Sequence, residues 1–371
     1  MRAASDFLSA RAMGVDASGI RKVFDLAAKL KDPINFSIGQ PDFDVPEEAK
    51  AAAIEAIKAG NNGYTQTQGI ADLRGRVRKQ LSAEFGRDVG EVLITSAVSG
   101  GLLLAIMSTI NPGDEALVLD PYFVMYKHLL TLTGGKTVAV DTYPDFAFHA
   151  DRVEKAITPR TKLLILNSPT NPTGAVMSDA DVLAAVEVAR THDLLIVSDE
   201  IYEPFLYEGG FLSPGKLYEN TVVLRGFSKS HAMTGWRVGY AAGPEAVISQ
   251  MTKLQQYTFV CSPSPFQVAA VRAMDLPTAA AREVYRKKRD LVYGLLSKKF
   301  EVNKPGGAFY IFPKAPKGMT ASEFCAKAIE NNVLIIPGNV FSEKDTHFRI
   351  SYATSDEKIK KGCEILCALA G

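Results

Sequence analysis

Residues 221–240 read TVVLRGFSKSHAMTGWRVGY, and they constrain the fold and chemistry of this chain more than any other segment. The apolar run at the start is typical of a buried strand, and Lys229 follows where that strand gives way to a loop. Arg237 comes eight residues after this lysine. A lysine whose pKa is lowered is a good Schiff-base nucleophile, and a forked guanidinium suits a phosphate. The segment predicts a site for a phosphorylated aldehyde, unless Lys229 is simply a solvated loop residue.

The composition excludes several classes of function. The chain has 371 residues, which is long enough for two domains, and its 42 Lys and Arg residues balance 41 Asp and Glu residues. Balanced charge argues against nucleic acid as a partner. The longest apolar stretch, residues 102–110, is too short to span a bilayer, so we expect no membrane segment.

The cysteines and the first residues indicate the compartment. The four cysteines are sparse and form no disulfide framework, and the opening residues show no apolar core of a signal peptide. Cys363 and Cys367 share one face of a predicted C-terminal helix without a histidine nearby. We therefore expect core packing there, no metal site, and a reduced cytoplasmic protein.

Seven short apolar runs alternate with helical segments between residues 46 and 275. Continuous apolar runs of this kind are typical of strands buried on both faces of a mainly parallel sheet. The predicted strands are 92–94, 116–119, 137–140, 163–166, 194–197, 222–224 and 238–241. The clearest predicted helices are 46–60, 70–85, 102–110 and one that starts after Ser178. The predicted fold class is α/β, with a large domain of residues 46–275 built on a mainly parallel seven-stranded sheet flanked by helices.

The pattern changes near Pro277. The elements expected in the remaining segments are a helix at 18–31, a long charged helix to 299, strands at 309–312, 333–336 and 348–351, and a helix from 355. This mixture indicates a smaller α+β domain, to which residues 1–45 and 276–371 both contribute.

Several polar residues lie at the carboxyl ends of the predicted strands, where ligands of open parallel α/β sheets gather. Residues 167–174, NSPTNPTG, form a stiff turn in which Asn171 either offers its amide to a ligand or closes the turn. Asp199 is either a helix cap or a functional anion. A buried carboxylate beside a pyridine nitrogen keeps that nitrogen protonated. Tyr202, three residues later, can reach a phenolic oxygen of the same ring.

Two further strand ends offer weaker signals. Residues 95–101, TSAVSGG, form a small-residue turn before an apolar helix, where free backbone N–H groups and the helix dipole favour a phosphate. Phe123 follows another strand and can stack on a flat ring. Packing alone also explains such a turn and such a phenylalanine, so neither is specific by itself.

In their order along the chain, these motifs resemble those of the class I and II pyridoxal-phosphate aminotransferases, which have the aspartate aminotransferase fold. The resemblance runs from IGQPD at 38–42 to FRISY at 348–352. It implies an enzyme that uses pyridoxal 5'-phosphate to move the α-amino group of an amino acid to a 2-oxo acid by a ping-pong mechanism. An aspartate-type substrate is the first expectation. The alternatives are an aromatic or broad-range aminotransferase, and a β-lyase or another pyridoxal-phosphate reaction on the same scaffold.

The resemblance also implies a role for each site residue. Lys229 would bind the cofactor aldehyde covalently and later move the substrate proton, and Asp199 would pair with the ring nitrogen. The other implied cofactor contacts are Asn171 and Tyr202 at the ring oxygen, Phe123 on the ring face, and Val98, Ser99, Ser228 and Arg237 at the phosphate. Arg349, with Gly39 and Asn171, would bind the substrate α-carboxylate. Tyr64 would reach the cofactor phosphate of the partner subunit, which makes the expected enzyme a homodimer with a shared site.

Three positions depart from the family pattern. Gly226 stands where some members have a hydroxyl, Phe123 replaces a more usual tryptophan, and Ser99 replaces lysine or threonine. No arginine can be assigned to a distal carboxylate, so aspartate and glutamate remain open as substrates. A non-catalytic ligand sensor is the rival from another class, but its helix-turn-helix domain and basic segment have no counterpart here.

Overall fold

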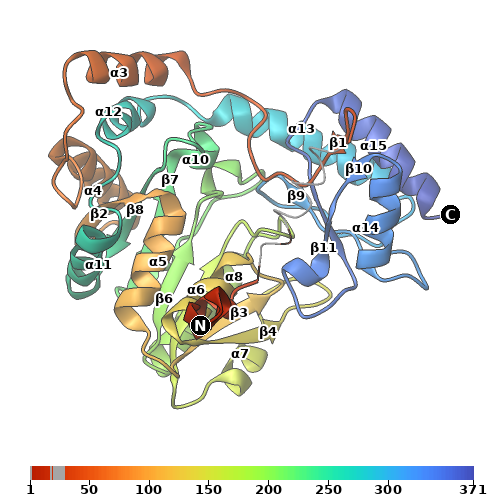
Figure 1. The fold of residues 1–371 in the computed structure, drawn as a ribbon, viewed down its shortest axis with the longest axis horizontal. Coiled ribbons are helices and arrows are strands. Elements are labelled where there is room, and N and C mark those ends of the chain that lie inside the picture. Colours follow the sequence, from red (N-terminus) through yellow and green to blue (C-terminus); the bar gives the residue numbers. More distant parts are fainter. Residues whose placement is uncertain (1, 17–18, 20–29) are drawn as a thin grey trace.

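The computed structural model describes residues 2–16, 19 and 30–371 (Figure 1). The helix expected at 18–31 lies almost entirely outside the described residues. The main sheet has the order β2-β8-β7-β6-β5-β3-β4. Its strands are β2 (Glu91–Ser96), β3 (Glu115–Asp120), β4 (Lys136–Asp141), β5 (Thr161–Asn167), β6 (Leu195–Asp199), β7 (Thr221–Gly226) and β8 (Val238–Gly243). All seven predicted strands are confirmed.

The strand directions explain where a ligand can bind. β3 pairs in parallel with β4 and β5, and β5, β6 and β7 continue the parallel series. β8 lies between β7 and β2 and is antiparallel to both. The carboxyl ends of the parallel strands therefore meet at one edge of the sheet. One expectation was wrong: β4 is not buried on both faces, because it is the edge strand and most of its residues are partly or fully exposed.

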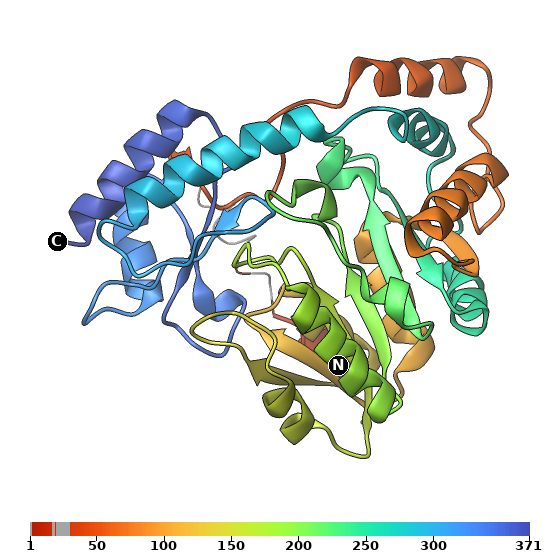
Figure 2. The same cartoon turned by 180° about the vertical axis from the view of Figure 1, so that it is seen from behind.

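Helices cover both faces of this sheet (Figures 1 and 2). One layer contains α5 (Ala97–Thr109), α6 (Met125–Thr133) and α11 (Glu245–Thr258), and the other contains α7 (Ala150–Ala156), α8 (Asp179–Thr191) and α9 (Pro214–Leu217). Alternate strand residues pack into separate clusters: Val118 and Ile165 share a core with α5, whereas Leu117 and Leu164 share one with α8. As predicted, Ser178 caps α8, and its hydroxyl accepts a hydrogen bond from the backbone N–H of Asp181.

Helix α5 starts five residues before the position that the sequence suggested. Residues 99–101 are not a turn before the helix; they belong to its first turns. The two glycines serve close packing, since a Cβ at Gly101 would lie 2.9 Å from the Leu224 side chain in the neighbouring strand. Val98 and Ser99 consequently stand at the helix N-terminus, at the carboxyl edge of the sheet.

The rest of the large α/β region contains α3 (Glu47–Lys58), α4 (Ala71–Phe85), α12 (Ser264–Ala273), η2 (Glu203–Phe205) and the short α10 (Phe227–Ser230). Helices α3 and α4 confirm the predictions for 46–60 and 70–85 to within two residues at each end. Among the described residues, no helix has the length and apolar character needed to cross a membrane.

A smaller group of elements lies beside the main sheet (Figure 2). It contains α13 (Ala279–Leu296), α14 (Ala321–Glu330), α15 (Asp356–Leu369), η3 (Gly338–Val340) and the short strands β9 (Tyr310–Ile311), β10 (Val333–Leu334), β11 (Ile336–Pro337) and β12 (Phe348–Ser351). The single strand expected at 333–336 is wrong, because β10 and β11 belong to different sheets: β10 pairs with β1 (Ile34–Asn35), and β11 pairs with β12. On α15, Cys363 is buried in the core and Cys367 is partly buried against it, which agrees with the expected core packing.

The start of the chain contacts both groups of elements. β1 joins the C-terminal part through its parallel pairing with β10. In contrast, α1 (Ala10–Met13), which follows η1 (Ala4–Phe7), contacts α6 of the main α/β region. The division into a domain of residues 46–275 and one of residues 1–45 and 276–371 stays a prediction.

Candidate active site

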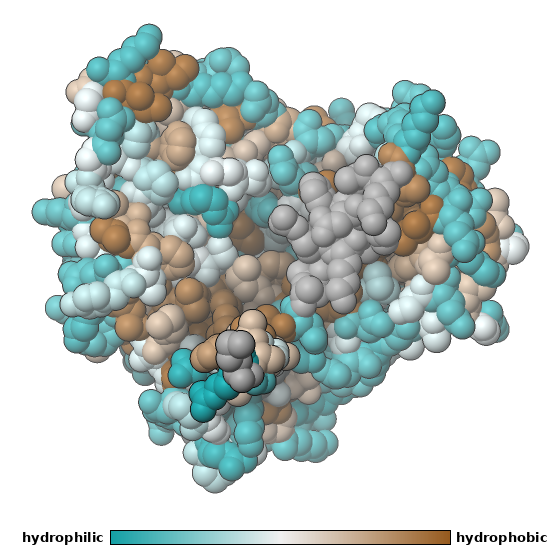
Figure 3. Space-filling view, in the orientation of Figure 1, coloured by the Kyte–Doolittle hydropathy of each residue, from teal (hydrophilic) through white to brown (hydrophobic). Residues whose placement is uncertain are grey.

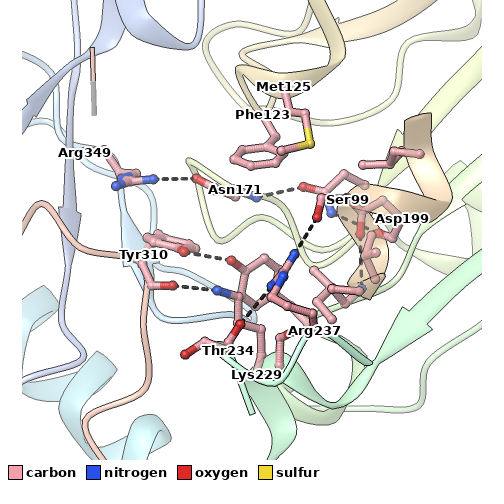
Figure 4. A pocket seen from close by; sticks show the side chains of 18 residues that line it. Ser99, Phe123, Met125, Asn171, Asp199, Lys229, Thr234, Arg237, Tyr310 and Arg349 are labelled. Carbon is pink, nitrogen blue, oxygen red and sulfur yellow. Dashed lines mark hydrogen bonds between the residues drawn. The ribbon is translucent and has the colours of Figure 1, made fainter. Parts of the chain in front are cut away.

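A cavity of about 270 Å³ lies at the carboxyl edge of the main sheet, between that sheet and β12 (Figure 4). It brings together the predicted site residues Gly39, Val98, Ser99, Phe123, Asn171, Asp199, Tyr202, Ser228, Lys229, Arg237 and Arg349. Tyr64 is the exception, because its side chain is 87% exposed and does not line the cavity. Residues more than 300 positions apart in sequence thus share one pocket.

Lys229 stands on α10, directly after β7, with its amine inside the cavity. The Nζ atom donates a hydrogen bond of 2.6 Å to the carbonyl oxygen of Gly39. Burial, followed by the positive charges of Arg349 and Arg237, lowers the Lys229 pKa to about 8, although Asp199 opposes the shift. An appreciable fraction of the amine is therefore neutral near neutral pH, which is the state that a nucleophile or a proton acceptor needs.

Asp199 is the last residue of β6, and only 3% of it is exposed. Its carboxylate accepts hydrogen bonds from the Tyr126 hydroxyl at 2.8 Å and from the backbone N–H of Ile201 at 3.3 Å. It caps no helix, because η2 begins only at Glu203 and has Tyr202 as its N-cap. Burial raises the Asp199 pKa to about 6, while the two hydrogen bonds act to lower it. Its orientation suits a functional anion rather than a cap.

Tyr126 is a site residue that the sequence reasoning missed. Both Phe123 and Tyr126 lie near the start of α6, three positions apart, and their rings meet edge to face with centroids 5.8 Å apart. Residues three apart share a helix face, so the helical spacing could have pointed to Tyr126 once Phe123 was singled out. Tyr310 was also missed, because the apolar run around it indicated only a strand.

Removing the Tyr126 hydroxyl is expected to raise the Asp199 pKa above about 6, because a hydrogen bond to the charged form favours that form. We expect Tyr126→Phe to shift the Asp199 pKa upward by about 1–2 units, the equivalent of one charged hydrogen bond. Carbon-13 NMR titration of the aspartate carboxyls measures this shift. Tyr122→Phe is the matched control, because Tyr122 is also buried but its hydroxyl does not bond to Asp199. An unchanged Asp199 titration in Tyr126→Phe would contradict the assignment.

One end of the cavity is built to hold an anion. Arg237 donates to the Ser99 hydroxyl at 2.7 Å and to the Thr234 carbonyl at 2.8 Å. No side chain of the described residues caps the N-terminus of α5, so its first backbone N–H groups stay available. The strand β8 can approach this end closely because it has Gly239, where a Cβ would lie 2.7 Å from the backbone of Ala97.

Ser228 supports the same interpretation of this end. Ser228 lines the cavity, and its buried hydroxyl has no hydrogen-bond partner among the described residues. A buried hydroxyl without a partner is costly, which indicates a ligand atom that completes it. A guanidinium, free backbone N–H groups and two hydroxyls form a donor set that fits a phosphate group.

The opposite end of the cavity has a second, separate anion site at Arg349 (Figure 4). Arg349 comes from β12, is 1% exposed, and donates to the Asn171 side-chain oxygen at 3.0 Å and to the Ser37 carbonyl at 2.5 Å. Its guanidinium carbon lies 4.7 Å from the ring centre of Tyr310 and 4.8 Å from that of Phe341. This sandwich fixes the planar group, and its buried Nε has no partner among the described residues. A carboxylate fits this fork.

The remaining wall of the cavity is aromatic and apolar. The Tyr202 and Tyr310 hydroxyls are 2.7 Å apart and share a hydrogen bond. Phe123 and Met125 add an apolar part to the wall (Figure 4). Within the part of the chain that the structure describes, no group of His, Cys, Asp and Glu residues is arranged to hold a metal ion. The site therefore offers an amine, a buried carboxylate and two anion sites.

Comparisons with known proteins agree with this geometry. The family model for class I and II aminotransferases matches residues 31–366. A probable aspartate aminotransferase of Methanocaldococcus jannaschii is 37% identical, over 97% of this chain and 98% of its own length. Aromatic-amino-acid aminotransferase 2 of Thermococcus litoralis is 38% identical over 96% of both chains. The structure of Thermus thermophilus aspartate aminotransferase with maleate superimposes with a TM-score of 0.93 over all of both chains, at 35% identity. The chain belongs to the class I and II aminotransferases, a family of pyridoxal-phosphate-dependent transferases.

Proposed function

We propose that this enzyme binds pyridoxal 5'-phosphate in the cavity and uses it to move the α-amino group of an amino acid to a 2-oxo acid. The observation that carries the proposal is the position of the Lys229 amine between two separate anion sites, at Arg237 and Arg349. One site suits the phosphate of the cofactor, and the other suits the carboxylate of the substrate. When bound, pyridoxal phosphate supplies an electron sink for the carbanion that forms when the substrate loses its α-proton.

The residues at the anion-binding end and along the ring would hold the cofactor. The proposed phosphate contacts are Arg237, Ser99, Ser228 and the backbone of Val98 at the start of α5. Asp199 would keep a proton on the ring nitrogen, since a buried carboxylate gains by facing a positive charge. Phe123 would cover the ring face in place of tryptophan. The Asn171 amide and the Tyr202 hydroxyl would contact the ring oxygen.

Lys229 would act as both the attachment point and the proton carrier. Its lowered pKa, about 8, lets the amine accept a proton at the substrate α-carbon and return it later. Arg349 would hold the α-carboxylate so that the α-carbon faces the amine. Arg349 is buried, which keeps water away from its guanidinium and strengthens its interaction with a carboxylate.

The substrate side chain remains a choice between two proposals. An aspartate-type donor agrees with the aspartate aminotransferases among the relatives. An aromatic donor is favoured by the cavity wall, which contains Leu102, Phe123, Met125 and Ile201. Among the described residues, the cations that line the cavity are Lys229, Arg237 and Arg349, and each already has a proposed role. The names of relatives include both substrate types.

A panel of amino donors with 2-oxoglutarate tests the proposed function. Wild-type enzyme should give 2-oxo acid products in a reaction that depends on the acceptor, whereas a β-lyase would release ammonia and pyruvate without it. Arg349→Lys should raise the KM of the amino donor by about 10²-fold or more, because a point charge replaces a bidentate fork. Keto-acid-independent ammonia release, or an unchanged KM in Arg349→Lys, would contradict this function.

We also propose that the active enzyme is a homodimer in which Tyr64 completes the partner's site. Tyr64, Tyr257, Phe259 and Val260 are large apolar or aromatic residues that the single chain leaves exposed. Exposed Ile54 and Ile57 add apolar surface over α3, at the upper left of Figure 3. A second subunit that covered these side chains would remove their apolar surface from water. Sedimentation of a monomer at micromolar concentration would rule out the shared site.

A cytoplasmic location is a further proposal. All four cysteines are free thiols, and Cys325 and Cys363 are buried where burial raises their pKa and keeps them unreactive. Recovery of activity mainly outside the cytoplasmic fraction after cell fractionation would contradict it.

A further inference from the structure

Three side chains outside the cavity hold the C-terminal end of the segment from Phe36 to Asp42. This segment contributes Gly39 to the cavity wall. We call Asp42, Tyr285 and Lys288 the Asp42 cluster. The Tyr285 hydroxyl donates to the Asp42 carboxylate at 2.8 Å and accepts from the Asp42 backbone N–H at 3.1 Å. The Lys288 ammonium forms an ion pair with the same carboxylate and donates to the Thr354 carbonyl at 2.6 Å. The cluster thus ties residue 42 to α13 and to the turn before α15.

The segment from Phe36 to Asp42 is anchored at its other end as well. The Phe36 N–H donates to the Leu334 carbonyl at 2.9 Å, and the Phe36 carbonyl accepts from the Ser351 N–H at 2.8 Å. Between the two anchors, two backbone carbonyls contact the site. The Ser37 carbonyl accepts from Arg349 at 2.5 Å, and the Gly39 carbonyl accepts from the Lys229 amine at 2.6 Å.

The surroundings make these positions sensitive to small shifts. A Cβ at Gly39 would collide with the Tyr310 hydroxyl, so this position has no room for a side chain. The Lys288 side chain is 10% exposed and that of Asp42 25% exposed, while Tyr285 is fully buried. Removing one charge from this partly buried pair leaves the other without its partner, and the segment should then move.

We propose that the Asp42 cluster positions Lys229 and Arg349 without touching the substrate. The cluster fixes the segment and with it the positions of two backbone carbonyls. The Ser37 carbonyl then orients the Arg349 guanidinium, and the Gly39 carbonyl holds the free Lys229 amine. A backbone carbonyl that accepts a hydrogen bond from an ammonium group favours its charged form. The contact with Gly39 therefore acts to raise the Lys229 pKa. The kinetic part of this inference rests on the proposed function, whereas the effect on the Lys229 pKa does not.

The test compares Asp42→Asn and Lys288→Met with wild type, by two measurements. In the holoenzyme, the KM of the amino donor should rise about tenfold with a smaller loss of kcat, since the Arg349 fork loses its orientation. In the protein without cofactor, the Lys229 pKa should fall by about 1 unit. Competitive acetylation across pH 6–10, followed by mass spectrometry of the Lys229 peptide, measures that pKa. Lys288→Arg keeps the cation and should keep the wild-type KM.

Glu115→Gln separates positioning from a general loss of stability. Glu115 is a buried carboxylate, bonded to Thr158 and Arg160, and it lies at the amino end of β3 outside the cavity. We expect this variant to lose stability while it keeps the wild-type KM and Lys229 pKa. The inference is overturned if Asp42→Asn and Lys288→Met match Glu115→Gln in both measurements. A wild-type enzyme without transamination activity would instead count against the proposed function. The Lys229 pKa from acetylation would still test whether the Asp42 cluster positions the amine.

Discussion

Replacement of Lys229 with alanine is expected to lower kcat for amino transfer by about 10⁴-fold or more, the upper end of what positioned proton transfer contributes. The variant loses the amine that would bind the cofactor covalently and the group that would move the α-proton. Phosphate binding by Arg237 and Ser99 should survive, because these side chains bond to each other and not to Lys229. The measurement is the kcat of the purified variant with saturating amino donor and 2-oxo acid.

The matched control is Lys253→Ala. Lys253 is an exposed lysine on α11 whose side-chain contact is with Gln250 one turn away, so its loss should leave kcat within about twofold of wild type. Both variants remove one lysine charge, but only one of the two lysines lies in the cavity. A Lys229→Ala enzyme that turns over at a rate close to that of Lys253→Ala would show that another group performs the chemistry.

Asp199→Asn should have the second largest effect, a loss of about 10²–10³-fold in kcat, comparable to the removal of one preorganised charge-stabilising contact. The amide keeps the size of the side chain but cannot hold a proton on the ring nitrogen as a carboxylate does. The electron sink then weakens, while the phosphate contacts remain. We expect the variant to retain cofactor, which separates this effect from a simple loss of binding. The kcat and the cofactor content per chain are the two quantities to measure.

Asp120→Asn controls for the burial of a carboxylate at a strand end. Asp120 ends β3, is 5% exposed, and burial raises its pKa to about 6, as it does for Asp199. It does not line the cavity, so its replacement should change stability but not kcat. Equal losses of kcat in the two variants would indicate a structural role for both residues and would remove Asp199 from the mechanism.

The strands and most of the site were predictable because local signals determine them. A short, continuous apolar run indicates a strand that is buried on both faces. The polar residues that follow parallel strands then lie at the same edge of the sheet. Lys229 and Arg237 both come shortly after the same strand. Their presence in one site could therefore be predicted from local sequence alone. Arg349 and Gly39 were placed by resemblance, and the structure brings both to the cavity.

Other features depend on contacts that the sequence does not display. The early start of α5 at Ala97 depends on Gly101, which disfavours a helix locally but fits against Leu224 in the folded chain. The split between β10 and β11 follows from their pairing with different partners. The hydrogen bond from Tyr126 to Asp199 joins residues that are 73 positions apart. Long-range pairing, rather than propensity, determines each of these.

Chemical trapping tests most directly whether Lys229 binds the cofactor aldehyde covalently. Purified enzyme is incubated with pyridoxal 5'-phosphate and reduced with borohydride, and its peptides are then mapped by mass spectrometry. We expect one modified peptide that carries the cofactor mass on Lys229. Modification of a different lysine, or no modification of any peptide, would contradict it.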